Sequence, residues 1–142
     1  MTAPALFSAF NMLALAGWIV LAAGVFLRRS FLRDTMAGLW LPVLLSCAYA
    51  ALILFFFASA PGGFSSLAEV QLLFTAPWAA LAGWVHYLAF DLWMGSRIAR
   101  ESDAIGLPRW PLIALLPLTF LFGPMGYLAF EAIKASTKGA KP

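Results

Sequence analysis

The sequence predicts an all-α integral membrane protein with four transmembrane helices in an up-and-down bundle. Of the 142 residues, 63% are hydrophobic and only 11% are charged, whereas about a quarter of the residues in a soluble domain are charged. The mean hydropathy is +0.91. Four runs without a charged residue are each long enough to cross a hydrocarbon core of roughly 30 Å as a helix. Arginines stand beside these runs in short groups, as the positive-inside rule requires.

Composition also narrows the classes of partner and site. The net charge of +3 and the pI near 9.4 would suit a nucleic-acid-binding protein. No nucleic-acid partner is expected, however, because the basic residues flank apolar runs. The only cysteine, Cys47, excludes an intrachain disulfide and a cysteine cluster for zinc or iron–sulfur. Residues 1–142 are therefore expected to form a single transmembrane domain, and no metal site is assigned to it.

The first predicted helix covers residues 5–27. It is not typical of a signal peptide, because no basic residue precedes it and its apolar core is too long. Ala14, Gly17, Leu21 and Gly24 fall on one helical face. Such a face of small residues would let another helix approach closely.

The second and third predicted helices cover residues 36–58 and 70–100. The loop 59–69 between them is rich in proline, glycine and serine and carries no basic residue, which suits the non-cytoplasmic side. Ser65 or Ser66 could cap a short helical turn in this loop.

The fourth predicted helix covers residues 110–133 and is irregular. Pro117 and Pro124 stand in its interior, and each removes a backbone hydrogen bond. Gly123 and Gly126 flank the second proline. A kink or a broken helix is therefore expected near Gly123 and Pro124. Inside a membrane, broken backbone is tolerated where it is buried in protein or lines a cavity.

The basic residues predict the orientation. Four spans place both termini outside and two arginine-bearing loops in the cytoplasm. The three lysines of the tail argue mildly against this arrangement. The six arginines of the two loops are Arg28, Arg29, Arg33, Arg97, Arg100 and Arg109.

The segment 84–97 contains the strongest candidates for a functional site. It holds the only histidine, His86, and also Asp91. Ionisable side chains inside an apolar segment are rare and costly, so they indicate function by default. Each residue of a helix turns by about 100°, which separates His86 from Asp91 by about 140°. The two are therefore expected to face different walls.

Both residues leave alternatives open. His86 could act as a general acid or base, ligate a haem or metal, or bond a neighbouring helix. One histidine per chain would require a second protomer, or a methionine such as Met94 or Met125, for a haem. Asp91 could be a catalytic or metal-binding carboxylate, or it could pair with Arg28 or Arg29 at the end of the first helix. Glu131 is expected at the opposite membrane face.

Other residues are predicted to support the site. Aromatic and polar side chains near it could bind a long apolar substrate, and small residues or prolines could shape the backbone. The expected substrate-binding residues are Trp84, Phe90, Trp93, Arg97, Thr119 and Tyr127, and the expected structural residues are Gly83, Gly123, Pro124 and Gly126.

Two phrases carry a family resemblance. Trp-Val-His-Tyr-Leu-Ala-Phe-Asp-Leu-Trp-Met-Gly-Ser-Arg begins at Trp84, and Leu-Thr-Phe-Leu-Phe-Gly-Pro-Met-Gly-Tyr-Leu begins at Leu118. The sequence resembles the membrane family named after the plant abscisic-acid-deficient-four protein. In plants that family is implicated in converting the epoxide violaxanthin to neoxanthin. The chain looks like a bacterial member, which implies a bacterial inner (cytoplasmic) membrane, with multiple spans and the N-terminus outside.

The resemblance implies a carotenoid or isoprenoid-lipid isomerase that needs no redox cofactor. Opening an epoxide requires an acid, and removal of a carbon-bound proton requires a base. His86, Asp91 and Tyr87 are the expected catalytic residues, because burial can adapt such groups to proton transfer. A bound carotenoid or haem stays open as an alternative ligand.

The alternative function is a non-catalytic pigment- or lipid-binding membrane subunit of a larger complex. Small helix faces and abundant aromatic residues suit this role as well as the enzyme. A homo-oligomer is a further expected partner, because one bundle of this size has little room for a complete enzyme. A small transporter is the weaker third interpretation.

Overall fold

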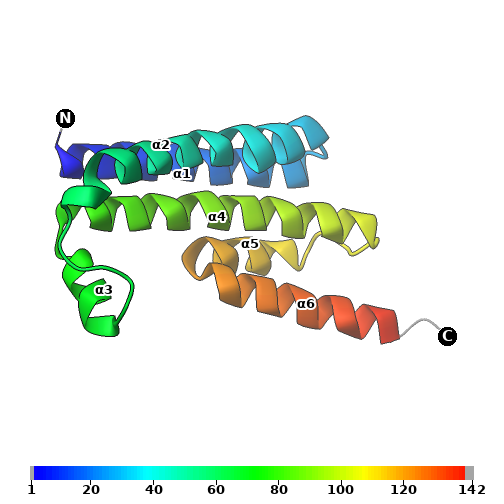
Figure 1. Cartoon of the computed structure of the whole chain (residues 1–142). Coiled ribbons are helices and arrows are strands. Elements are labelled where there is room, and N and C mark those ends of the chain that lie inside the picture. The colour runs from blue at the N-terminus through cyan, green and yellow to red at the C-terminus, as the bar shows by residue number, and fades with distance from the viewer. Residues whose placement is uncertain (1, 140–142) are drawn as a thin grey trace.

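The computed structural model describes residues 2–139, and over this range its regular elements are all helices (Figure 1). Two of them depart from α geometry, a π-helix and a single 3-10 turn. The elements are α1 (Ala3–Phe26), η1 (Phe31–Trp40), α2 (Leu41–Phe56), η2 (Phe57–Ser59), α3 (Leu67–Leu73), α4 (Pro77–Ala104), α5 (Leu112–Leu121) and α6 (Gly123–Gly139).

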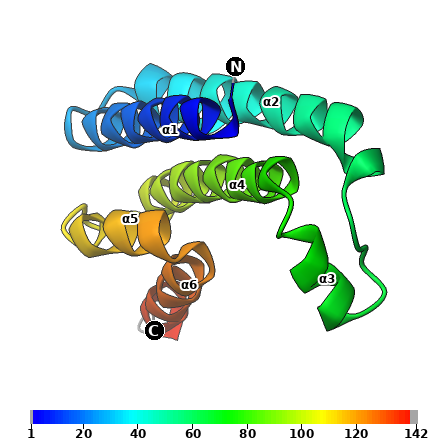
Figure 2. The same ribbon diagram turned by 90° about the vertical axis from the view of Figure 1, so that its left-hand side faces the viewer.

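Helix α4 is the centre of the fold. Figure 1 and the end view in Figure 2 both show α1 and α2 on one side of it and α5 and α6 on the other. The predicted small face of α1 is confirmed, because Ala14, Gly17, Leu21 and Gly24 are all buried. A β-carbon on Gly17 would lie 2.6 Å from a methyl group of Leu92 in α4. The glycine therefore permits the close approach of α1 and α4.

The second helix is longer than predicted. It begins at Phe31 as η1 and continues through α2 without a break, so that Phe31–Ser59 forms one helix of 29 residues. The expected start at residue 36 is wrong because the two charges before it are paired. Arg33 forms ion pairs with Asp34 and with Asp103 of α4, and a paired charge is tolerated in a helix end.

The third predicted helix is two helices. α3 and α4 meet at an angle of 101° across residues 74–76, and Figure 2 shows α3 standing away from the bundle. Pro77 begins α4, and Ala76 before it is extended, as a residue preceding proline favours. The hydroxyl of Ser66 accepts a hydrogen bond from the Glu69 amide at 3.2 Å, which confirms the predicted cap of α3.

The fourth predicted helix is also divided, and its break lies where the sequence indicated. α5 ends at Leu121 and α6 begins at Gly123, while Phe122 between them has φ −147° and ψ 68°. α6 then runs back along α4 instead of continuing away from it (Figure 1). With ten residues, α5 is about 15 Å long, half of a hydrocarbon core.

α5 and α6 together form a helical hairpin. Ion pairs with the C-terminal end of α4 hold both ends of this hairpin. Arg109, just before α5, pairs with Asp103 at 3.3 Å. Lys134, near the end of α6, pairs with Glu101 at 2.8 Å and with Glu131 at 3.2 Å. The expected fourth crossing is therefore not confirmed. The expected position of Glu131 at the opposite end is wrong, because Lys134 joins it to the end of α4.

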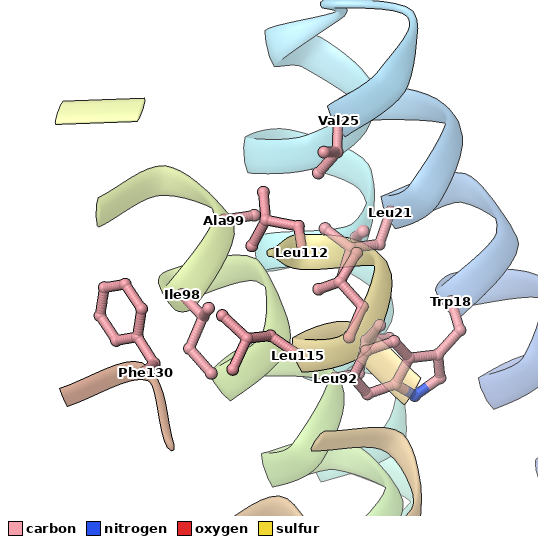
Figure 3. Close-up of a cluster of buried hydrophobic side chains, with 11 residues drawn as sticks. Trp18, Leu21, Val25, Leu92, Ile98, Ala99, Leu112, Leu115 and Phe130 are labelled. Carbon is pink, nitrogen blue, oxygen red and sulfur yellow. The ribbon is translucent and has the colours of Figure 1, made fainter. Parts of the chain in front are cut away.

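Two apolar clusters form the core. One joins α4 to α1, α5 and α6, and Figure 3 shows Trp18, Leu21, Leu92 and Leu115 from this cluster. The other joins α4 to α1 and α2. By length and composition, α1 and Phe31–Ser59 can each cross a membrane, and the bent pair α3–α4 would be a third span.

Candidate functional site

Asp91 is the buried carboxyl group at the middle of the fold. It lies on α4, and only 7% of the residue is exposed. Its Oδ2 atom has no hydrogen-bond partner among the described residues. The predicted alternative of an ion pair with an arginine of the first helix is wrong, because no ion pair among the described side chains of residues 2–137 includes Asp91. Burial of a carboxyl oxygen without a partner is costly, which makes Asp91 the first candidate for a functional residue.

The tip of the α5–α6 hairpin covers Asp91. A β-carbon on Gly123, the first residue of α6, would lie 2.7 Å from Cγ of Asp91. A β-carbon on Gly126 would lie 2.6 Å from Cα of Thr119 in α5. Only glycine fits at these two positions without displacing the carboxyl group or the backbone of α5. The predicted structural role of both glycines thus has a steric basis.

Tyr87 holds the break between α5 and α6. Its hydroxyl donates a hydrogen bond to the carbonyl oxygen of Leu121 at 2.6 Å. In a continuous helix the amide of Met125 would bond this carbonyl, but that amide bonds Phe122 instead. Pro124 has no amide hydrogen to offer the carbonyl of Phe120. Tyr87 therefore satisfies a carbonyl that the break leaves open, and it lies one helical turn from Asp91.

Thr119 also donates a hydrogen bond to a backbone carbonyl of α5. It is fully buried, and its hydroxyl donates to the carbonyl oxygen of Leu115 at 2.7 Å. This bond keeps the hydroxyl inside α5. The side chain therefore contributes to the packing of the hairpin beside Gly126.

Trp84 extends the aromatic wall from Tyr87 toward the start of α4. Its ring centroid lies 5.4 Å from that of Tyr87 and 5.7 Å from that of Phe7 in α1. Its indole N–H donates to Oδ1 of Asn11 at 3.1 Å. Sequence reasoning missed Asn11, although an asparagine inside the first apolar run was a signal that could have identified it.

His86 lies on another face of α4, as the spacing predicted. Its ring contacts Tyr49 of α2 edge-on at 5.3 Å and stacks on Phe90 at 4.7 Å. It lines an apolar groove of about 210 Å³ that also includes Gly83. Phe90 and Trp93 line a second groove of about 340 Å³ beside α2. His86 is exposed there and does not share a site with Asp91.

The remaining predicted residues lie apart from the carboxyl group. Arg97 pairs with Glu101 at 2.8 Å toward the end of α4, and Tyr127 is exposed on α6. Among the side chains that the structure describes, no group of three or more that could ligate a metal is found. The structure thus brings together Asp91, Tyr87, Thr119, Gly123 and Gly126, and separates them from the histidine.

This arrangement limits the chemistry that the site can support. A single carboxyl group with a free oxygen, enclosed by apolar side chains, can accept or donate one proton, or bind one hydroxyl group. The phenol of Tyr87 is engaged with a backbone carbonyl. The site therefore has one carboxyl group, a phenol that donates to a backbone carbonyl, and an aromatic wall.

Comparison with known proteins gives one finding. A model of the family described as "ABA DEFICIENT 4-like" matches residues 5–130, which include α4, α5 and the first part of α6. No curated protein and no solved structure matches the chain.

Proposed function

Because the chain belongs to the ABA DEFICIENT 4-like family, we propose that it is a membrane isomerase for an oxygenated isoprenoid lipid, with Asp91 as its acid–base group. The observation that carries the proposal is the free Oδ2 atom of this buried carboxyl group beneath the hairpin tip. Aromatic side chains beside it suit the flat, conjugated chain of a carotenoid.

The proposed membrane placement has three crossings and one half-crossing. α1, the helix Phe31–Ser59 and α4 span the membrane, with the N-terminus outside. The α5–α6 hairpin enters from the cytoplasmic side, turns near the middle and returns. The positive-inside rule supports this placement, because the arginine-bearing turns and the end of α6 lie at the same end of the bundle. The tail lysines then follow the rule instead of opposing it.

The proposed reaction moves one proton within the substrate. The Asp91 carboxylate removes a proton from the carbon next to the epoxide. The electrons of that C–H bond form a new carbon–carbon double bond, and the adjacent carbon–oxygen bond of the epoxide breaks. Asp91 then returns the proton to the oxygen, which becomes a hydroxyl group. No atom or electron is gained or lost, so one carboxyl group suffices.

The two other expected catalytic residues receive different roles. Tyr87 positions the hairpin over Asp91, since its hydroxyl bonds the Leu121 carbonyl. His86 faces α2 and takes no part in the proton transfer. This assignment separates the acid–base role from the aromatic groove near the histidine.

The test is conversion of violaxanthin by the full chain in phospholipid vesicles. We expect the wild-type protein to form an allenic isomer of unchanged mass. Asp91→Asn should lower the rate about 10²- to 10⁴-fold, as loss of an acid–base group does, while His86→Gln should retain it. Violaxanthin that is bound by the wild-type protein but never converted would overturn the isomerase proposal and favour a pigment-binding subunit.

A further inference from the structure

A groove lies on the same stripe of α4 as Asp91, nearer to the N-terminal end of that helix. It has a volume of about 340 Å³. Every side chain around it is apolar or aromatic, and they come from the first two turns of α1 and of α4. The lining residues are Ala3, Pro4, Phe7, Pro77, Ala80, Leu81 and Trp84.

Helical spacing connects this groove with the carboxyl group. Ala80, Trp84, Tyr87 and Asp91 follow one another at intervals of four, three and four residues, so they share one face of α4. From Pro77 to Asp91 the helix rises about 21 Å. The stacked rings of Trp84 and Tyr87 form a continuous wall between the groove and the carboxyl group.

The lining of the groove on α4 ends at Trp84, and the hairpin begins further along α4, at the level of Asp91. Gly123 packs against the carboxyl group, and α5 and α6 extend from there toward the other end of α4 (Figure 1). The N-terminal half of the stripe is therefore not covered by the hairpin. The hydrogen bond from Trp84 to Asn11 holds the wall of the groove against α1.

We infer that this groove holds the apolar chain of the lipid substrate, with its oxygenated end group directed toward Asp91. The inference rests on the proposed function and adds the direction of binding. The two ends of the stripe differ in chemistry, because only the Asp91 end holds a carboxyl oxygen, which is buried and has no hydrogen-bond partner. A lipid with a polar end and a long apolar chain is complementary to that difference. It enters from the outer half of the membrane.

The other grooves beside α4 lack this complementarity. The groove that includes His86 has about 210 Å³, and the groove beside Trp93 faces α2. Neither is lined by Trp84 or Tyr87, the aromatic residues that lead along α4 to Asp91. Binding along the stripe of Trp84 and Tyr87 is therefore the arrangement that brings an end group to the carboxyl oxygen.

The test fills the groove with one larger side chain. Ala80→Trp places an indole among the lining residues, and Ala50→Trp on the exposed part of α2 is the matched control. We expect Ala80→Trp to weaken binding of violaxanthin in mixed phospholipid micelles by about tenfold or more, because the indole occupies the space of the chain. Ala50→Trp should bind as the wild type does. Binding is measured from the carotenoid absorbance that coelutes with the protein.

A second variant, Ala3→Trp, fills the opposite wall in case Ala80→Trp does not fold. Normal binding by folded protein of either variant would overturn the inference, and so would a wild-type groove that takes up only phospholipid. The two proposals fail separately. Unchanged turnover in Asp91→Asn with lost binding in Ala80→Trp would remove the isomerase mechanism and keep the groove. Normal binding in Ala80→Trp with lost turnover in Asp91→Asn would remove the groove and keep the isomerase mechanism.

Discussion

Gly123 of α6 packs so closely on Asp91 of α4 that a β-carbon at position 123 would lie 2.7 Å from the carboxyl carbon. This contact joins two features that are far apart in the sequence, the break in the last apolar run and the buried carboxyl group. It also explains why position 123 is a glycine, because no other residue type would fit against the carboxyl group without moving it.

Gly123→Ala is expected to destabilise the protein by about 1–3 kcal/mol, as overpacking of a buried site does. Thermal unfolding in detergent measures the change. The double variant Gly123→Ala with Asp91→Ala removes the atoms that the new methyl group would meet. The stability that the double variant loses should therefore be smaller than the sum of the losses in Gly123→Ala and Asp91→Ala. Additive losses would show that the two residues do not interact.

Tyr87→Phe is expected to cost about 0.5–1.5 kcal/mol, because the Leu121 carbonyl loses its hydrogen bond. Turnover should fall much less than in Asp91→Asn, since the phenol positions the hairpin and transfers no proton. Thermal unfolding and the violaxanthin assay give the two quantities. A loss of turnover as large as that of Asp91→Asn, in protein of unchanged stability, would instead make Tyr87 catalytic.

Lys134 is expected to fasten the returning helix to α4. Glu101 and Glu131 raise the pKa of the Lys134 ammonium group above its usual 10.5 through hydrogen bonds and charge. A raised pKa in the folded state means that this contribution to stability is fully present below pH 10.5. It is lost as the pH rises through the higher folded value.

Lys134→Met should therefore lower the unfolding temperature at neutral pH. The stability of this variant should also fall less than that of the wild type when the pH is raised above 10.5, because the variant has no lysine to deprotonate. Ala135→Met, at an exposed neighbouring position, is the control and should leave both unchanged. An identical alkaline profile in Lys134→Met and the wild type would contradict the assigned ion pairs.

Much of the fold could be predicted from the sequence because its causes are local. Small residues at helical spacing indicated the buried face of α1, and Pro124 beside Gly123 indicated the break before α6. The rotation of about 100° per residue separated His86 from Asp91. The two sequence phrases indicated the family that the comparison then identified.

The direction of the chain after the break could not be predicted in this way. An apolar run has the same hydropathy whether it continues across the membrane or turns back, and hydropathy carries no information about direction. The return of α6 depends on contacts between distant residues, such as Gly126 with Thr119 and Lys134 with Glu101. The tail lysines were the one signal in the sequence, because they conflicted with an outside C-terminus.

The sharp bend before α4 also depends on its surroundings. Hydropathy joins α3 and α4 into one run, although they meet at 101°. α4 carries Asp91, Ser96 and Ser102 in its buried face, so it is less apolar than a helix exposed to lipid. It is stable at the centre because five other elements cover it, which the sequence of α4 alone does not reveal.

The most direct test of this account is the side of the membrane on which α6 ends. Single cysteines are introduced as Ser30→Cys, Ser65→Cys and Ser136→Cys in a Cys47→Ala background, because Cys47 is exposed. A thiol reagent that cannot cross membranes is then applied to sealed vesicles of known orientation. The account predicts that Ser136→Cys reacts from the same side as Ser30→Cys and from the side opposite to Ser65→Cys. Reaction of Ser136→Cys together with Ser65→Cys would mean a fourth crossing and would contradict the hairpin over Asp91.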